Sequence, residues 1–301
     1  MRNLALLVCV TFLCQAGCQK PAPLTVEPLP VSPASSLTVT VLANPDTNIA
    51  VNPIDSIGVL PTDQTNYSGL FLVNSVKYDN GRGVASVTSA SAYFGDHNRP
   101  LVVNGRIVGF YGIDLMPSSS YPLKIAGIPM IRYPYKLHVG DLDTTFGYIY
   151  RAPAFFLALI QPKTRYDWDD PGLDTTRLTP LRDSVVTPED LTVQAPVGGS
   201  ILSRLKSVEL QWKGNGNLSI IISSYNVLTG KTKPILQLQP AVNTGYAVVE
   251  PSVLQLLPHT RYFVFTFIIA NRGDQLLDGL SSTDRILVQA ASVYNSYLQL
   301  Q

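Results

Sequence analysis

The chain has three cysteines, and all of them lie within its first 18 positions, at Cys9, Cys14 and Cys18. The thiolate form of cysteine is the strongest side-chain nucleophile near neutral pH, so this placement limits thiol chemistry to one end of the protein. Cys9 and Cys14 lie within an apolar run, whereas Cys18 directly follows two small residues. Cys18 is therefore the cysteine whose backbone a processing enzyme can approach most closely.

The first 17 residues have the three-part layout of an export signal. They begin with a charged stretch containing Arg2, continue with an apolar run from 4 to 13, and end in Ala16 and Gly17. An apolar run of this kind is too short to span a bilayer, which needs roughly 20 apolar residues. Residues 1–17 are therefore expected to direct export and then to be removed.

Ala16, Gly17 and Cys18 together resemble the lipobox of bacterial lipoproteins, although Gln15 stands where that family usually has Leu. The resemblance implies that the Cys18 sulfur is alkylated with a diacylglyceryl group, that the signal is cut before it, and that the new amino terminus is acylated. It also implies export and lipid anchoring to a bacterial cell envelope, at the outer membrane if the organism has one. Ordinary secretion with a free Cys18 and a retained helical anchor are the alternatives.

The segment that follows the anchor is rich in proline. Residues 18–37 hold five prolines and no apolar period, which favours an extended, semi-rigid tether. The whole chain carries 22 basic and 21 acidic side chains, and loss of Arg2 with the signal makes the two numbers equal. A balanced chain lacks the basic excess that nucleic-acid binding requires, so that class of partner is not expected.

A polar cluster at Asp96 and His97 is the first candidate site in the exported part of the chain. The two residues lie in the sequence FGDHNRP together with Arg99 and could meet a ligand at a loop. The same residues are typical of an ordinary turn, because Asp and Asn bond their own backbone. Both interpretations stay open on the sequence alone.

Four aspartates within eight residues form a second candidate, for calcium, which takes six to eight oxygen ligands. Their spacing matches no EF-hand, and Pro171-Gly172 indicates a turn, so a solvated loop is the alternative. The three histidines show no spacing typical of zinc, and no cofactor is expected. The aspartates are Asp167, Asp169, Asp170 and Asp174.

Tyrosines alternate along two neighbouring strand-like runs, RYPYKLHV and FGYIYRAPAFF. On an exposed face they could stack on sugar rings or on a peptide, whereas on a buried face they would pack in a core. Core packing is the commoner role of such residues in β-sandwiches, and we take these tyrosines as possible ligand-binding residues. They are Tyr133, Tyr135, Tyr148 and Tyr150.

The sequence lacks the common catalytic motifs. It has no nucleophile elbow and no P-loop, and its four glutamates have no context typical of a glycosidase pair. We therefore expect a non-enzymatic binding, adhesion or assembly module, with an envelope protein or a glycan as partner. The alternatives are a glycan-binding lipoprotein that uses the tyrosines, and an accessory glycan-active enzyme with carboxylates near Asp96 or Asp114.

The remainder of the chain predicts an all-β protein. Short runs rich in Val, Ile, Tyr and Thr recur between Gly, Pro, Asn and Asp from residue 38 onwards, and residues 38–160 are expected to form a β-domain of no assigned family. Asn104-Gly105 between two apolar runs predicts a hairpin at about 100–112. Residues 161–191 are polar and proline-containing, which predicts a linker or a long loop, packed down in part by Tyr166 and Trp168.

Residues 192–301 contain six or seven short strand-like runs, the number found in a β-sandwich. The run LLPHTRYFV, with Leu256, Pro258, Thr260, Tyr262 and Val264, resembles the corresponding segment of fibronectin type III domains. The resemblance implies such a sandwich, with Trp212 in its core and with the Tyr262 hydroxyl bonded back to the upstream backbone. An immunoglobulin-like sandwich without its cysteine pair is the near alternative.

Overall fold

Strands make up most of the protein, in agreement with the expected all-β class. The computed structural model describes residues 36–42, 67, 69–103, 106–112, 123–139, 142–170, 181–276 and 285–301, which belong to one compact unit. Helix within these ranges is limited to two single turns, α3 (Ala154–Leu157) and α4 (Pro251–Leu254). Cys18, the predicted lipidation site, and residues 18–35 of the tether expected at 18–37 lie outside the described residues.

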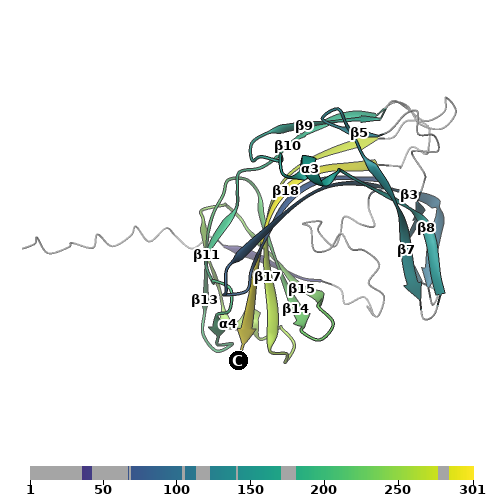
Figure 1. Cartoon of the computed structure of the whole chain (residues 1–301). Helices are drawn as coiled ribbons and strands as arrows, with labels where there is room; N and C mark the ends of the chain where they lie inside the picture. The colour runs from purple at the N-terminus through teal and green to yellow at the C-terminus, as the bar shows by residue number, and fades with distance from the viewer. Residues whose placement is uncertain are drawn as a thin grey trace, which may run out of the picture. The chain divides into compact units, whose positions relative to one another are not determined.

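One large sheet runs through most of the described chain (Figure 1). Its strands, in spatial order, are β1 (Leu37–Val41), β15 (Lys231–Pro240), β14 (Leu218–Asn226), β17 (Tyr262–Leu276), β18 (Arg285–Leu300), β2 (Gly69–Asp79), β3 (Val84–Val103), β8 (Leu142–Arg151) and β7 (Ile131–Val139). Two further strands pair off this path, β12 (Ile201–Leu202) with β18 and β4 (Arg106–Gly112) with β3. Most pairs are antiparallel, but β18 lies parallel to β2 and to β12.

Two smaller sheets complete the described fold. One has the order β10 (Leu181–Val186), β9 (Arg165–Asp170), β5 (Lys124–Ile125) and β6 (Ile128–Pro129). The other has the order β11 (Thr192–Ala195), β13 (Val208–Lys213) and β16 (Tyr246–Val249). Each contributes buried side chains to one of the two largest hydrophobic cores among the described residues, and the large sheet contributes to both.

The strand β18 explains how one sheet supports two cores. Alternate residues of a strand point to the same side, and those of one side of β18 are apolar near both ends. Ile286, Val288 and Ala290 pack in the first core, while Tyr294 and Leu298 pack in the second. Both small sheets therefore cover the same face of the large sheet, one towards each end of β18.

The change from one core to the other occurs at Ser292 of β18. Its side chain lies on the same face, between the two apolar groups, and its buried Oγ accepts a hydrogen bond from the Leu191 backbone N–H at 2.9 Å. Leu191 immediately precedes β11, so this bond fixes the point where the chain passes from the first small sheet to the second. A polar residue is tolerated at this buried position because its oxygen is paired.

The first core is centred on Phe71 of β2. The Phe71 ring meets Phe94 at 4.9 Å and Trp168 at 4.7 Å, both in edge-to-face arrangements, which aromatic rings prefer over a direct face-to-face stack. Trp168, on β9, is 1% exposed. The small sheet is therefore attached to the large one through fully buried aromatic rings.

Residues 161–191 differ from the expected linker or long loop, because they contain the antiparallel strands β9 and β10. The expectation that Tyr166 and Trp168 pack down is confirmed, since both are buried. The hairpin at 100–112 is also confirmed by the pairing of β3 with β4, with its turn at 104–105 outside the described residues. Strands from the ranges 38–160 and 192–301, expected to form separate domains, hydrogen-bond to each other within the large sheet.

The expected core tryptophan, Trp212, is buried on β13, and its Nε1 donates to Asn243 Oδ1 at 2.7 Å. The corner before β17 differs from the tyrosine arrangement that the resemblance implies. Tyr262 is 37% exposed, and its ring lies under the Arg261 guanidinium at 5.6 Å. The carbonyl groups of this corner are instead bonded by the guanidinium of Arg204, which comes from the segment after β12.

Arg204 makes four hydrogen bonds to main-chain oxygens of the corner. Its Nη1 donates to Leu254 O at 3.4 Å and to Leu257 O at 3.1 Å, and its Nη2 donates to Pro258 O at 2.7 Å and to Thr260 O at 2.9 Å. A planar guanidinium with five N–H donors suits such a set of converging carbonyls. The corner is thus stabilised by a side chain that lies about fifty residues away in the sequence.

Candidate functional site

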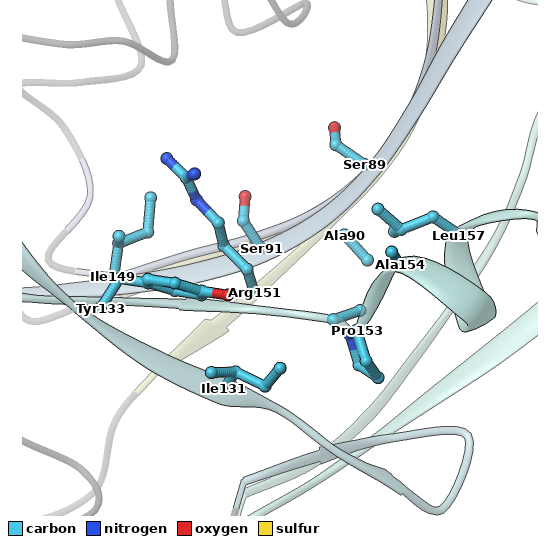
Figure 2. A pocket seen from close by; sticks show the side chains of 11 residues that line it. Ser89, Ala90, Ser91, Ile131, Tyr133, Ile149, Arg151, Pro153, Ala154 and Leu157 are labelled. Carbon is cyan, nitrogen blue, oxygen red and sulfur yellow. The ribbon is translucent and has the colours of Figure 1, made fainter.

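A cavity of about 390 Å³ lies where β3, β7, β8 and the α3 turn meet (Figure 2). This volume is within the range of small-ligand sites, about 300–1,000 Å³. Seven of the lining residues are apolar and four are polar. The lining residues are Ser89, Ala90, Ser91, Ile131, Tyr133, Ile149, Arg151, Ala152, Pro153, Ala154 and Leu157.

The end of β8 creates this cavity. The β3–β8 ladder stops at the pair Ser91 and Arg151, with one more backbone bond from Ala152 N to Ala90 O at 2.9 Å. Pro153 follows, and proline cannot continue a ladder because it has no backbone N–H. The residues of β3 that precede Ala90 therefore have no β8 residue beside them.

The chain after β8 turns into α3 and forms one wall of the cavity. Thr88 Oγ1, on β3, donates to the Leu157 carbonyl oxygen at 2.7 Å and holds the turn against the strand. Phe156 of α3 is buried in the first core, so the neighbouring Ala154 and Leu157 are free to line the cavity. The α3 wall thus takes its position from one core residue and one side-chain hydrogen bond.

Polar groups gather on one side of the cavity. Figure 2 shows the hydroxyl groups of Ser89 and Ser91 and the guanidinium of Arg151 pointing to the same side of the ribbon, while Ala90 points the other way, towards α3. The Arg151 guanidinium lies 5.6 Å from the centre of the Tyr133 ring. Arg151 is exposed, and among the described residues no carboxylate forms an ion pair with it.

Two buried polar groups on the cavity face of the sheet lack hydrogen-bond partners within the described ranges. The Ser89 hydroxyl is one, and the other is the amide of Asn74, whose Oδ1 and Nδ2 are both unbonded although the residue is 0% exposed. Asn74 of β2 lies directly opposite Ser89 of β3, so the two side chains share a face of the sheet. An unpaired buried polar group costs about 1–3 kcal/mol, so two neighbouring ones are an unusual feature.

The described lining of the cavity consists of hydrogen-bond donors and apolar groups. It offers hydroxyl donors, one guanidinium and an aromatic ring, but the described lining has no carboxylate, imidazole or thiol to act as a general acid or base. Within the described lining, the serine hydroxyls therefore have no adjacent base of the kind that a nucleophile needs. A guanidinium and hydroxyls can instead hold an anionic or hydrogen-bond-accepting ligand.

The four candidate tyrosines are divided between the two faces of the β7–β8 hairpin. Tyr150 is 0% exposed and lies in the first core, and Tyr148 packs against that core with Arg132 over its ring at 4.6 Å. Tyr133 is 42% exposed and lines the cavity. Tyr135 is half-buried and meets Tyr93 edge to face at 5.5 Å.

Tyr93 links the tyrosine face of this hairpin to β4. Its hydroxyl donates to the Phe110 carbonyl oxygen at 2.6 Å, and burial raises its pKa above the usual range of tyrosine. The phenol therefore stays protonated as a hydrogen-bond donor at any physiological pH. Tyr93 and Tyr135 are consequently packing residues beside the cavity, and Tyr133 is the candidate tyrosine that borders it.

The Asp96 and His97 cluster lies on β3 beyond the cavity. Asp96 Oδ1 accepts a hydrogen bond from the Asn98 backbone N–H at 3.0 Å, which is the bond that the turn interpretation requires. The His97 side chain and Asp114, the residue considered for an enzyme, lie outside the described part of the chain. Among the described residues, Asp96 belongs to no cluster of carboxylates or imidazoles.

The candidate calcium ligands lie mostly on β9, where Asp167 and Asp169 share one face of the strand. Asp167 accepts from Arg165 Nε at 2.8 Å in a surface ion pair, with both side chains about two-thirds exposed. An exposed pair of this kind contributes little to stability and leaves the aspartate already partnered. The side chain of Asp170 and all of Asp174 lie outside the described residues, so the calcium interpretation stays a prediction.

Neither a metal-binding cluster nor a membrane-spanning helix is present among the described residues. Across these ranges, no group of three or more His, Cys, Asp and Glu side chains is close enough to hold a metal ion. In the same part of the chain, no helix is long and apolar enough to cross a membrane.

Sequence reasoning missed Arg151, Ser89 and Asn74. A signal for Arg151 was present, since a single charge ends the alternating run FGYIYR directly before Ala-Pro, where a strand must stop. No comparable signal marks Asn74 or Ser89, because their proximity depends on the register of β2 with β3.

Comparison with known proteins found no matching family model, no matching curated protein and no matching solved structure.

Proposed function

We propose that this protein is an exported, lipid-anchored envelope protein that acts as a non-enzymatic binding module, with the β3–β7–β8–α3 cavity as its ligand site. The observation that carries the proposal is the cavity itself, in which Arg151 has no carboxylate partner among the described residues and the Ser89 hydroxyl has no hydrogen-bond partner there. Polar groups converging in a largely apolar cavity are the usual composition of a ligand site.

The second core supports a fibronectin-type-III-like scaffold for this module. The three-stranded sheet β11-β13-β16 contributes Leu210 and Trp212 to that core, and the strands β14, β15, β17 and β18 of the large sheet contribute the opposite side. Two sheets that pack face to face around a buried tryptophan are typical of such sandwiches. The scaffold does not determine function, which has to be argued from the cavity.

Blocking the cavity tests the binding function. Ala154 is exposed and lines the cavity, so Ala154→Trp would fill it without disturbing a core, whereas Ala158→Trp, just after the same turn but outside the lining, is the matched control. A thermal-shift screen of envelope glycans, peptides and carboxylic acids should identify ligands that raise the melting temperature of the wild type and of Ala158→Trp. Ligands that bind Ala154→Trp equally well would refute the cavity as the site.

Lipid anchoring at Cys18 is tested separately. We expect the wild-type protein to remain with membranes after a high-salt wash, and Cys18→Ala to be released, because the thioether-linked chains would be lost. Cys14→Ala, which lies in the signal, is the control and should fractionate like the wild type. Membrane retention of Cys18→Ala would contradict lipidation.

Glycan capture is a second candidate function, supported by Tyr133. Its ring is 42% exposed at the cavity, where it could stack on a sugar. Tyr133→Ala should then weaken glycan binding, while Tyr148→Ala, on the opposite face of the hairpin, should not. Equal glycan binding by wild type and Tyr133→Ala would contradict this candidate.

A further inference from the structure

We infer that the ligand of this cavity is a carboxylate carried by an apolar group, an inference that rests on the proposed binding function. The chemistry has two natural sources, the free C-terminus of a peptide that ends in an apolar residue and a free aliphatic acid. Both present one negative charge at the end of an apolar body. The cavity offers both kinds of contact, a guanidinium with hydroxyl groups and apolar side chains next to them.

The polar side of the cavity suits a single carboxylate. Arg151 is the one charged residue among the described residues of the lining, and a guanidinium can donate two parallel hydrogen bonds to the two oxygens of a carboxylate. Ser91 lies opposite Arg151 in the β3–β8 ladder and points to the same side, and the unbonded Ser89 hydroxyl follows two residues away. A doubly charged phosphate would place two negative charges against one cation.

The apolar lining of the cavity favours an apolar body on the ligand. Ile131 and Ile149 lie on the same hairpin face as Arg151 and border it, whereas Leu157, Pro153 and the alanines line the cavity towards α3. A sugar would bury hydroxyl groups against these side chains, at a cost for each one left without a partner. An aliphatic side chain or acyl chain gains free energy from the same contact.

Arg132 provides a matched control for Arg151. Each guanidinium lies over a tyrosine ring of the β7–β8 hairpin, Arg151 over Tyr133 at 5.6 Å and Arg132 over Tyr148 at 4.6 Å. Both arginines are exposed, but Arg132 belongs to the opposite face and does not line the cavity. Comparison of variants at Arg151 and Arg132 therefore separates the effect of the cavity guanidinium from the effect of removing any one positive charge.

The test compares ligands that differ only in charge. Isothermal titration calorimetry of the protein would use acetyl-Ala-Ala-Leu with a free C-terminus, the same peptide as its C-terminal amide, and decanoate beside decanamide. We expect at least one acid to bind about tenfold or more tightly than its amide, as a charge-assisted bidentate pair allows. Arg151→Gln should remove that difference, Ser89→Ala should reduce it, and Arg132→Gln should leave it intact.

The outcomes separate the inference from the proposed function. Preference for the peptide acid identifies a C-terminus as the source, and preference for decanoate identifies an aliphatic acid. If acids and amides bind alike, and Arg151→Gln changes neither while Ala154→Trp abolishes both, the cavity binds ligands but the carboxylate inference is refuted. Binding that withstands Ala154→Trp refutes the proposed function as well, as does the absence of any ligand.

Discussion

Replacement of Arg204 tests whether this side chain, and not Tyr262, stabilises the corner before β17. Arg204→Ala would remove all four hydrogen bonds to the corner carbonyls, at 2.7 to 3.4 Å. It would also remove the guanidinium from beside the Phe263 ring, whose centre lies 5.4 Å away. The perturbation therefore removes one donor group from a fixed set of main-chain acceptors.

The expected decrease in the free energy of unfolding of Arg204→Ala depends on how exposed these acceptors are. The bonds to Pro258 O and Thr260 O are exposed, so water can replace them, whereas those to Leu254 O and Leu257 O are partly buried. A hydrogen bond to a charged group contributes about 1.5–3 kcal/mol, and the exposed pair contributes less. We expect Arg204→Ala to lower the free energy of unfolding by about 2–3 kcal/mol.

Tyr262→Phe and Arg261→Ala are the comparison variants. The Tyr262 hydroxyl has no hydrogen bond among the described residues, so its removal should change the free energy of unfolding by less than about 0.5 kcal/mol, as is usual for surface substitutions. Arg261→Ala loses one exposed bond, from Nε to Gln299 Oε1 at 2.8 Å, and should cost less than Arg204→Ala.

Urea unfolding, followed by tryptophan fluorescence and far-UV circular dichroism, measures all three variants. The order Arg204→Ala, then Arg261→Ala, then Tyr262→Phe, from most to least destabilised, is the expected result. A greater loss from Tyr262→Phe than from Arg204→Ala would refute the arginine corner and favour the tyrosine arrangement of the resembled family.

Two further predictions concern Asp79, whose Oδ2 accepts from Gly198 N at 2.8 Å and from the Tyr294 hydroxyl at 3.1 Å. A Cβ at Gly198 would collide with Asp79, so Gly198→Ala should lower the free energy of unfolding, measured in urea, by about 3 kcal/mol. A Cβ at Gly230 meets only open space, so Gly230→Ala should lower it by about 1 kcal/mol because of the positive φ. Equal losses from the two variants would contradict the packing argument. Burial, the Asp79 charge and the hydrogen bond to Asp79 raise the pKa of Tyr294 to about 12. A tyrosine in the unfolded chain ionises near pH 10. The contribution of the Tyr294 hydroxyl to the free energy of unfolding is therefore complete below about pH 10 and is lost as the pH rises towards 12. Tyr294→Phe should therefore show a shallower fall in the urea midpoint over that interval, and an unchanged slope would contradict the assignment.

Local sequence patterns were sufficient for the all-β class, for the hairpin at 100–112 and for the burial of Trp212. These features depend on residues close together in the chain: alternation for a strand, Asn-Gly for a turn, and an aromatic residue on the apolar side of β13. The strands β9 and β10 were not predicted, because the polar and acidic sequence of residues 161–191 indicated a linker or a long loop. Their buried side is carried by Tyr166, Trp168 and Val185, which face the first core.

Long-range pairing accounts for what the sequence did not show. The parallel ladder between β2 and β18 joins segments more than two hundred residues apart, and no local pattern specifies such a pair. The β2–β18 ladder places Asn74 beside Ala291, and the β2–β3 ladder places it beside Ser89, in the middle of the large sheet. The tyrosines illustrate the same limit, since alternation predicts two faces but not which face a core will cover.

The position of the cavity follows from a difference in length between neighbouring strands. β8 ends at Arg151 because Ala152 and Pro153 follow, whereas β3 continues through Ser89 and pairs there with β2. Side chains on β3 that would lie beside those of a neighbouring strand in a complete ladder therefore border the cavity instead. Arg151, as the last residue of the shorter strand, can direct its guanidinium over this opening without crossing the sheet. A ladder that stops early thus places one cation and the unbonded Ser89 hydroxyl together, which is the arrangement that a carboxylate ligand would complete.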